Sequence, residues 1–222
     1  MHRILLYLVI FLFSSFLANA QFNKGSILLG GQISYSYYSY SDKNVNFPPG
    51  NDQKANYANF NISIGKAVKE NTVVGIILTY SPYSANNYSA FGLSGPLKYQ
   101  DNSYAIGIFY RKYKSLGKEF FLFGEADAFY SGSSISAKDS TGNKVLTGSG
   151  NGGTINLFPG ISYKISKKFF LELSIPNLFF AQYSKSNITS QPETSKSDQL
   201  SISSSLSSNP LTDLAIGFRL DL

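Results

Sequence analysis

Two acidic residues, Glu125 and Asp127, come closer than any others in this sequence to a catalytic arrangement. They stand two residues apart, so in an extended strand both side chains lie on the same face. Two neighbouring carboxyl groups can serve as a general acid and a general base. Pairing with basic residues inside a fold explains the same two acids without catalysis, and we favour that structural interpretation.

Other reactive groups are scarce. The sequence has no cysteine, and its one histidine is His2, in a segment that we expect to be removed. Ser–His–Asp and Cys–His arrangements are therefore excluded, as are metal sites made of His or Cys. The glycine-rich run 148–153 precedes no helix pattern, and no calcium-loop motif occurs. We predict no catalytic residue, no metal site and no cofactor.

The two acids belong to a stretch, residues 104–130, that has the pattern of strand, turn and strand. Apolar residues alternate with small or polar ones along both arms, and this period of two is typical of β-structure. From Phe120 to Tyr130, steps of roughly 3.3 Å at a tilt of about 40° give a height of about 25 Å, the apolar band of an outer-membrane barrel. Tyrosines at both ends of the apolar rows suit a membrane–water interface.

The same alternation recurs along the chain and predicts eight strands, at residues 26–41, 55–68, 72–80, 104–111, 120–130, 152–166, 169–183 and 211–222. The connections alternate long and short, with long loops that include residues 42–54, 81–98 and 131–151 and a polar, loop-like segment at residues 184–197. A ninth and a tenth strand could lie within residues 131–151 or 184–209. The expected fold is all-β: a single antiparallel up-and-down transmembrane β-barrel, with both termini in the periplasm.

The polar face of these strands consists mostly of Gly, Ser, Ala and Asn with single charges, which suits a narrow barrel interior better than a water-facing surface. Buried charges require partners. We therefore predict an interior charge network with a structural role, made of Arg111, Glu125, Asp127, Lys164, Glu172 and Arg219. A transport role for these charges is the less favoured alternative, because eight-stranded barrels rarely leave an open lumen.

The chain begins with a basic start, an apolar run from Ile4 to Leu17 and the sequence Ala18-Asn19-Ala20. This is the pattern of a secretory signal peptide, residues 1–20, cleaved between Ala20 and Gln21. Residues 21–222 would then form the barrel domain. Charged residues are only 14% of the sequence, low for a soluble surface. Export makes nucleic acid an unsuitable partner for the net charge of +6; lysines at the short turns suit the membrane edge or lipid headgroups.

Several segments together resemble the small outer-membrane β-barrel domain family of Gram-negative bacteria, the OmpA/OmpX-like and "porin family" proteins, above all those of Bacteroidota. They are the signal peptide end, IGIFYRKYKSLGKEFFLFGEA, LFPGISYKISKKFFLELSI and the ending AIGFRLDL. The ending also resembles the signal read by the barrel-assembly machinery, through Gly217, Leu220 and Leu222, although aromatic residues are usual where these leucines stand.

This resemblance implies an eight-stranded barrel in the outer membrane. We expect a monomer in contact with outer-membrane lipids and with the barrel-assembly machinery. We expect a structural or surface-interaction role through the long extracellular loops, which could bind an extracellular ligand. The alternative is a narrow pore or small-molecule transporter.

Overall fold

The computed structural model describes residues 22–40, 53–88, 97–117, 119–176, 178–190, 193–204 and 214–222. These residues form ten strands: β1 (Ile27–Tyr40), β2 (Gln53–Lys69), β3 (Thr72–Tyr88), β4 (Leu97–Ser115), β5 (Phe120–Lys138), β6 (Lys144–Lys164), β7 (Phe169–Ser174), β8 (Phe179–Ser190), β9 (Glu193–Ser203) and β10 (Ala215–Asp221). No helix in these ranges is long and apolar enough to cross a membrane. The predicted signal peptide, its cleavage between Ala20 and Gln21, and most of the 42–54 loop lie outside the described residues.

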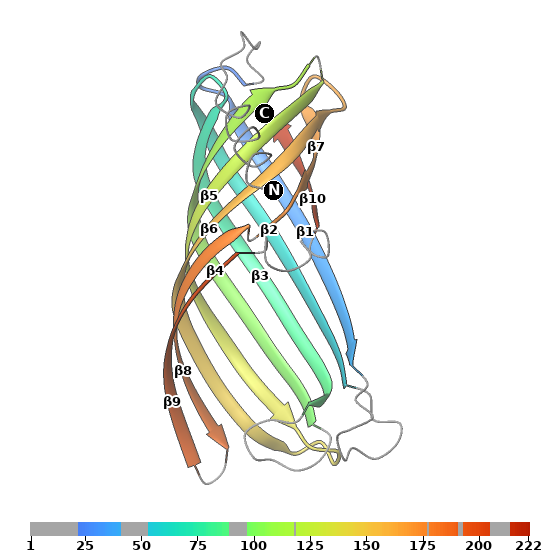
Figure 1. The fold of residues 1–222 in the computed structure, drawn as a ribbon, viewed down its shortest axis with the longest axis vertical. Helices are drawn as coiled ribbons and strands as arrows, with labels where there is room; N and C mark the ends of the chain where they lie inside the picture. Colours follow the sequence, from blue (N-terminus) through green and yellow to red (C-terminus); the bar gives the residue numbers. More distant parts are fainter. Residues whose placement is uncertain are drawn as a thin grey trace, which may run out of the picture.

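The strands close into a ring in which all neighbours are antiparallel (Figure 1). From β1 to β6, each strand pairs with the next strand in the sequence. β10 completes the circle because it pairs with β1 on one side and with β7 on the other, and β7 pairs with β6. Among the described strands, the closed part of the barrel therefore has the eight strands that the sequence predicts.

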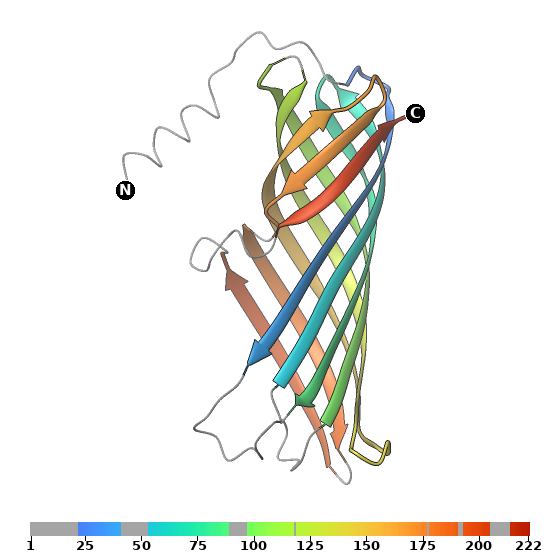
Figure 2. The same cartoon turned by 90° about the vertical axis from the view of Figure 1, so that its right-hand side faces the viewer.

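The prediction of one strand over residues 169–183 is wrong, because this segment forms two strands with separate partners. β7 ends at Ser174 and β8 begins at Phe179, with Pro176 between them. Proline has no backbone N–H to give to a ladder, so it suits such a break. β7 pairs with one end of β6 and continues the sheet to β10, whereas β8 pairs with the other end of β6 and carries β9 (Figure 2, orange and brown).

The prediction of a loop over residues 131–151 is also wrong. β5 continues to Lys138 and β6 begins at Lys144, so only a short turn joins them. Residues 184–197, expected to be loop-like, hold the end of β8 and the start of β9, and β3 runs on to Tyr88. These segments are rich in Ser, Gly and Asn and lack the apolar alternation that marks a half-buried strand, so backbone pairing with the neighbouring strand is what extends them.

The strands are much longer than a membrane crossing requires. β5 has 19 residues, and at roughly 3.3 Å per residue and a tilt of about 40° such a strand rises about 45 Å. The apolar band of a membrane barrel is only about 25 Å tall. About 20 Å of the sheet therefore extends beyond such a band, and Figure 1 shows the long strands running away from the end where β1 begins and β10 ends.

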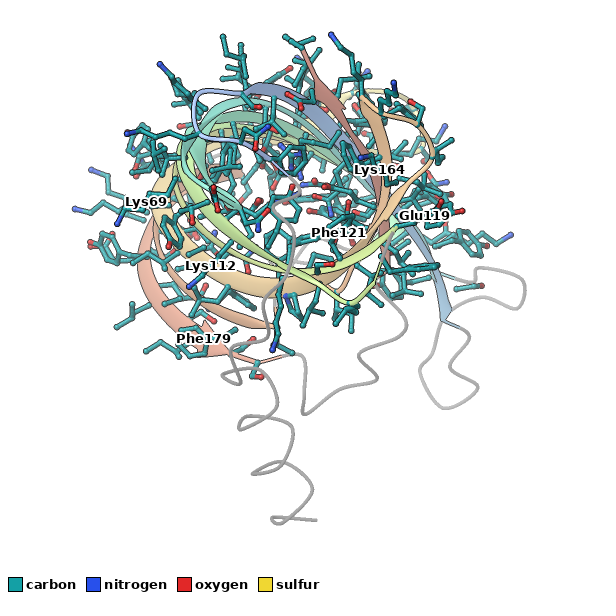
Figure 3. The ribbon with its side chains drawn as sticks, turned by 90° about the horizontal axis from the view of Figure 1, so that it is seen from above. Lys69, Lys112, Glu119, Phe121, Lys164 and Phe179 are labelled. Atoms are coloured by element: carbon teal, nitrogen blue, oxygen red, sulfur yellow. The ribbon has the colours of Figure 1, made fainter. Side chains whose placement is uncertain are left out.

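At the end of the barrel where β1 begins and β10 ends, the outer and inner faces differ sharply in exposure. The Ile108 side chain is 65% exposed on the outside, whereas its neighbour Phe109 is 3% exposed and faces inward. Figure 3, a view from above, shows Phe121 directed into the ring and Lys69 on its outside. The exposed outer side chains form a continuous apolar surface that includes Ile62, Ile64, Ile76, Leu78, Ile106, Ile108, Ile155, Ile161, Leu171, Leu173 and Ile216.

Glycines on neighbouring strands make room for the inward-facing phenylalanines. Phe109 lies opposite Gly75, and Phe123 lies opposite Gly160. A Cβ atom at either glycine would come within 3 Å of the facing phenylalanine ring. Large rings can therefore lie flat against the backbone of the next strand, which lets a narrow barrel hold several of them.

Candidate functional site

The interior near the termini is filled by an aromatic plug, made of Phe22, Phe109, Tyr113, Phe121, Phe123, Phe158 and Phe170 with smaller apolar residues around them. At the N-terminal end of the described chain, Phe22 is fully buried, and its ring lies 5.0 Å from those of both Tyr113 and Phe170. The Phe22 carbonyl oxygen accepts a hydrogen bond of 3.2 Å from the Asn71 backbone N–H. The segment before β1 is thus folded against the end of the barrel and closes it.

An ion cluster crosses the lumen next to the plug. Arg111 on β4 pairs with Glu125 at the facing position of β5, and through Nη1 with Glu172 Oε2 on β7 at 2.6 Å. Arg219 on β10 reaches the same Glu172 oxygen at 3.4 Å. The Tyr113 hydroxyl donates to Glu172 Oε1 at 3.1 Å. Glu172 therefore joins two arginines and a tyrosine from strands on different sides of the barrel.

The other two residues of the predicted network form no ion pair in the described structure. Asp127 is 4% exposed and follows Glu125 on the inner face of β5, yet its Oδ1 atom has no hydrogen-bond partner among the described residues. Lys164 is half-buried near the end of β6, with its Nζ 5.9 Å from the centre of the Phe170 ring. The geometry thus brings together Arg111, Glu125, Glu172 and Arg219, with Asp127 beside them.

The three residues of the proposed assembly signal lie on the closing strand. Gly217 faces inward between Gln32 of β1 and Glu172 of β7 in the two ladders. Leu220 pairs with Leu29 and Phe169, and the Leu222 backbone N–H donates to the Ile27 carbonyl oxygen at 2.9 Å. The last residues of the chain therefore belong to the ladder that closes the ring.

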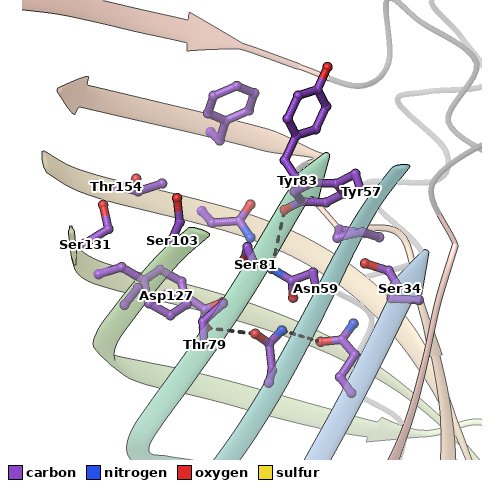
Figure 4. Close-up of a pocket in the computed structure, with 18 of the residues that line it drawn as sticks. Ser34, Tyr57, Asn59, Thr79, Ser81, Tyr83, Ser103, Asp127, Ser131 and Thr154 are labelled. Atoms are coloured by element: carbon purple, nitrogen blue, oxygen red, sulfur yellow. Dashed lines mark hydrogen bonds between the residues drawn. The ribbon is translucent and has the colours of Figure 1, made fainter. Parts of the chain in front are cut away.

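Beyond the ion cluster, the lumen widens into a cavity of about 550 Å³. Hydroxyl and amide side chains from several strands line it, including Gln32, Ser34, Asn59, Asn61, Thr79, Ser81, Ser103, Ser131, Thr154 and Asn156 (Figure 4). Some of these groups bond to one another: Asn59 Nδ2 donates to Ser81 Oγ at 2.7 Å, and Thr79 Oγ1 donates to Asn61 Oδ1 at 2.8 Å. The aromatic rings of Phe129, Phe158 and Phe180 share the same lining.

Farther from the plug, the outer face changes from apolar to polar. Past Tyr104 on β4 and Tyr130 on β5, the outward positions are polar, with Lys98, Gln100, Asn102, Ser134, Ser136 and Lys138. Beyond the cavity, inward residues form a second buried apolar cluster, made of Leu97, Ile135, Ala137 and Leu146. An apolar inside with a polar outside is typical of a sheet in water, so the tyrosines mark the boundary between two solvents.

Three parts of this interior leave no clear pattern in the sequence. Phe22 lies before the first predicted strand, and nothing in its local pattern indicates that it is buried. Tyr113 lies in the segment between residues 111 and 120 that the sequence predicts to be a turn, but β4 continues through it to Ser115. The cavity arises because small residues from strands far apart in the sequence meet at one level of the barrel. In the described ranges, no group of three or more His, Cys, Asp or Glu residues is arranged to hold a metal ion.

No protein-family model matches the chain, and no curated protein matches it. Solved structures with a similar fold include Neisserial surface protein A, with 13% identity, a TM-score of 0.39, and coverage of 90% of this chain and 98% of that one. The N-terminal β-barrel domain of OprF from Pseudomonas aeruginosa has 11% identity, a TM-score of 0.39, and coverage of 90% and 100%. A major outer membrane protein from Thermus thermophilus has 10% identity, a TM-score of 0.45, and coverage of 88% and 99%.

The closed antiparallel ring and the polarity of its faces define the class of this protein. A continuous exposed apolar exterior, around an interior already filled by aromatic rings and ion pairs, is stable only where lipid surrounds the outer face. The chain is a membrane-spanning up-and-down β-barrel.

Proposed function

We propose that this protein is an outer-membrane β-barrel of a Gram-negative bacterium with a structural or surface-interaction role and no catalytic activity. The change of the outer face from apolar to polar past Tyr104 and Tyr130 carries this proposal, because it separates a lipid-facing band from a wall that extends into water. The signal peptide pattern in residues 1–20 supports export to that membrane. Both termini would lie on the periplasmic side, next to the short turns.

The extended wall supports a role at the cell surface. Its outer face presents hydroxyl, amide and lysine side chains on β4, β5 and β8, which can form hydrogen bonds with an extracellular partner. A rigid sheet presents such groups in fixed positions, which lowers the entropy cost of binding. We propose that this wall contributes to surface contacts together with the loops.

The aromatic plug opposes the alternative of a narrow pore. Phe22, Phe170 and Phe121 are buried across the periplasmic end of the lumen, and the ion cluster lies directly next to them. A solute would have to displace both. Outer-membrane lipids and the barrel-assembly machinery would be the other partners, and the barrel would be monomeric.

Conductance in planar lipid bilayers tests this proposal. We expect the purified full-length barrel to give no steady single-channel current. In a separate test of the surface role, exchange of the β5–β6 turn for an unrelated turn should alter the binding of whole cells to surfaces, while the barrel still folds. A stable conductance that disappears when the lumen is blocked would favour the narrow pore or transporter instead. Cell fractionation provides the control for location: recovery as a soluble periplasmic protein would contradict the outer-membrane assignment.

A further inference from the structure

The base of the cavity presents two buried oxygen atoms without hydrogen-bond donors. Asp127 on β5 and Asn156 on β6 occupy facing positions in the β5–β6 ladder, and their side chains are 4% and 8% exposed. Both residues line the cavity, and neither Asp127 Oδ1 nor Asn156 Oδ1 has a hydrogen-bond partner among the described residues. Buried acceptors without donors are costly, so this pair is suited to a ligand that supplies N–H or O–H groups.

The charges around Asp127 favour a cationic donor. In the ion cluster, two arginines are matched by the carboxylates of Glu125 and Glu172. Asp127 adds a further carboxyl group, next to that of Glu125, and it has no ion pair in the described structure. A buried carboxyl group without its own counter-ion takes up either a proton or a cation.

The rest of the cavity has the same preference. Its lining includes a second carboxyl group, Asp101, and contains no lysine, arginine or histidine among the described residues. Phe129, Phe158 and Phe180 line it as well, and aromatic faces attract cations and accept apolar stems. The volume of about 550 Å³ falls within the range of roughly 300–1,000 Å³ typical of small-molecule sites.

We propose that this cavity binds a small organic amine, with its ammonium group hydrogen-bonded to Asp127 and Asn156 and its apolar stem against the phenylalanines. This function goes beyond a surface role, because the site lies inside the barrel and above the plug. The ligand enters and leaves on one side of the membrane, since the plug and the ion cluster lie between the site and the periplasmic end.

Calorimetric titration of the full-length barrel in detergent micelles with benzylamine and with benzyl alcohol tests the proposal. The two probes are close in shape and differ in the ammonium group. Benzyl alcohol therefore serves as the control for nonspecific partition into the micelle. We expect the wild-type barrel to bind benzylamine at least about tenfold more tightly than benzyl alcohol. Equal affinities, or no binding of benzylamine, would overturn the proposal.

Two variants locate the site. Asp127→Asn keeps the shape but removes the charge, and we expect it to reduce benzylamine affinity to the level of the alcohol. Asp139→Asn makes the same change in an exposed turn outside the cavity lining, and we expect affinity to be unchanged. Unchanged affinity in a folded Asp127→Asn barrel would place the amine elsewhere. If that variant does not fold, Asn156→Leu decides the question: it replaces the second acceptor by an apolar side chain, so benzylamine affinity equal to that of the wild type would overturn the proposal.

Discussion

At the scale of single residues, Glu172 holds the centre of the buried ion cluster. Glu172→Leu leaves two buried guanidinium groups without this partner, and we expect it to lower the free energy of unfolding by about 3–5 kcal/mol. Glu125→Leu should cost less, because Arg111 keeps its pair with Glu172. Urea unfolding of the reconstituted barrel measures both values.

Glu70 in the β2–β3 turn provides the matched control for this comparison. It is exposed, so Glu70→Leu should change the free energy of unfolding by no more than about 0.5 kcal/mol. If Glu172→Leu costs no more than this control, the ion cluster contributes nothing to stability.

A second prediction at this scale concerns pH and the turn between β5 and β6. Asp139 Oδ1 accepts hydrogen bonds from the Thr141 hydroxyl at 2.7 Å and from the backbone N–H groups of Thr141 and Asn143, each at 2.9 Å. These bonds lower the pKa of the Asp139 carboxyl in the folded turn, and the bond from the Thr141 hydroxyl has the largest effect. A lowered pKa means that the turn is fully stabilised above the unfolded-state value and loses this contribution as pH falls through the folded-state value.

Nuclear magnetic resonance of the barrel in micelles measures this titration. The amide proton shifts of Thr141 and Asn143 should change with a midpoint below the usual pKa of aspartate, while the shifts of β5 residues in the membrane stay constant. Asp139→Asn, which cannot ionise, should show no such titration. A midpoint at or above the usual value would mean that the carboxylate does not hold the turn.

At the scale of elements, the alternation of each strand decides which side chains meet lipid. Ile108 lies in the middle of β4 on the outer face, facing Ile76 of β3 and Ala128 of β5 in the ladders. Ile108→Arg places a charge in the apolar band and should lower the free energy of unfolding by about 2–4 kcal/mol. Unfolding in lipid vesicles provides the measurement.

The same substitution at Ile165 is the control, because this residue is exposed in the short turn between β6 and β7. Ile165→Arg should cost only about 0–1 kcal/mol, as expected near the interface. If the two substitutions cost the same, the band does not lie where the strand pattern places it.

At the scale of the whole molecule, the barrel depends on closure by β10. Deletion of residues 220–222 removes the Leu220 and Asp221 positions of the β1 ladder and the bond from Leu222 to Ile27. An edge left open in lipid exposes backbone N–H and C=O groups that have no other partner. We expect the truncated protein to be exported but to remain in the periplasm or to be degraded.

Gel electrophoresis of unheated and heated samples measures this outcome. The full-length barrel should run at different apparent sizes in the two conditions, and the truncated protein should lose the difference. Deletion of the same number of residues from the exposed turn at residues 140–142 serves as a control and should retain it. A truncated protein that still shows the heat-dependent shift would mean that closure does not rely on β10.

Alternation alone was enough to predict the membrane-spanning part of the fold. A strand with one face in lipid must repeat every two residues, so the rows from Tyr104 to Tyr110 and from Phe120 to Tyr130 indicate both strand and face without any tertiary contact. The same period places Arg111, Glu125, Glu172 and Arg219 inside, because each stands on the face opposite the apolar row. Eight such segments, with the last able to meet the first, imply a closed ring.

Tertiary structure decided what the period of two cannot encode. Residues 131–151 form strands because a neighbouring strand accepts their backbone bonds, whereas their Ser and Gly side chains give little sign of burial. The break at Pro176 redirects β7 and β8 to different partners, and the choice of partner depends on strands far away in the sequence. The register between neighbouring strands decides which charged residues form ion pairs and leaves Asp127 without one. The sequence pattern does not fix this register, because sliding a strand by two residues keeps every side chain on its face but changes all of its cross-strand neighbours.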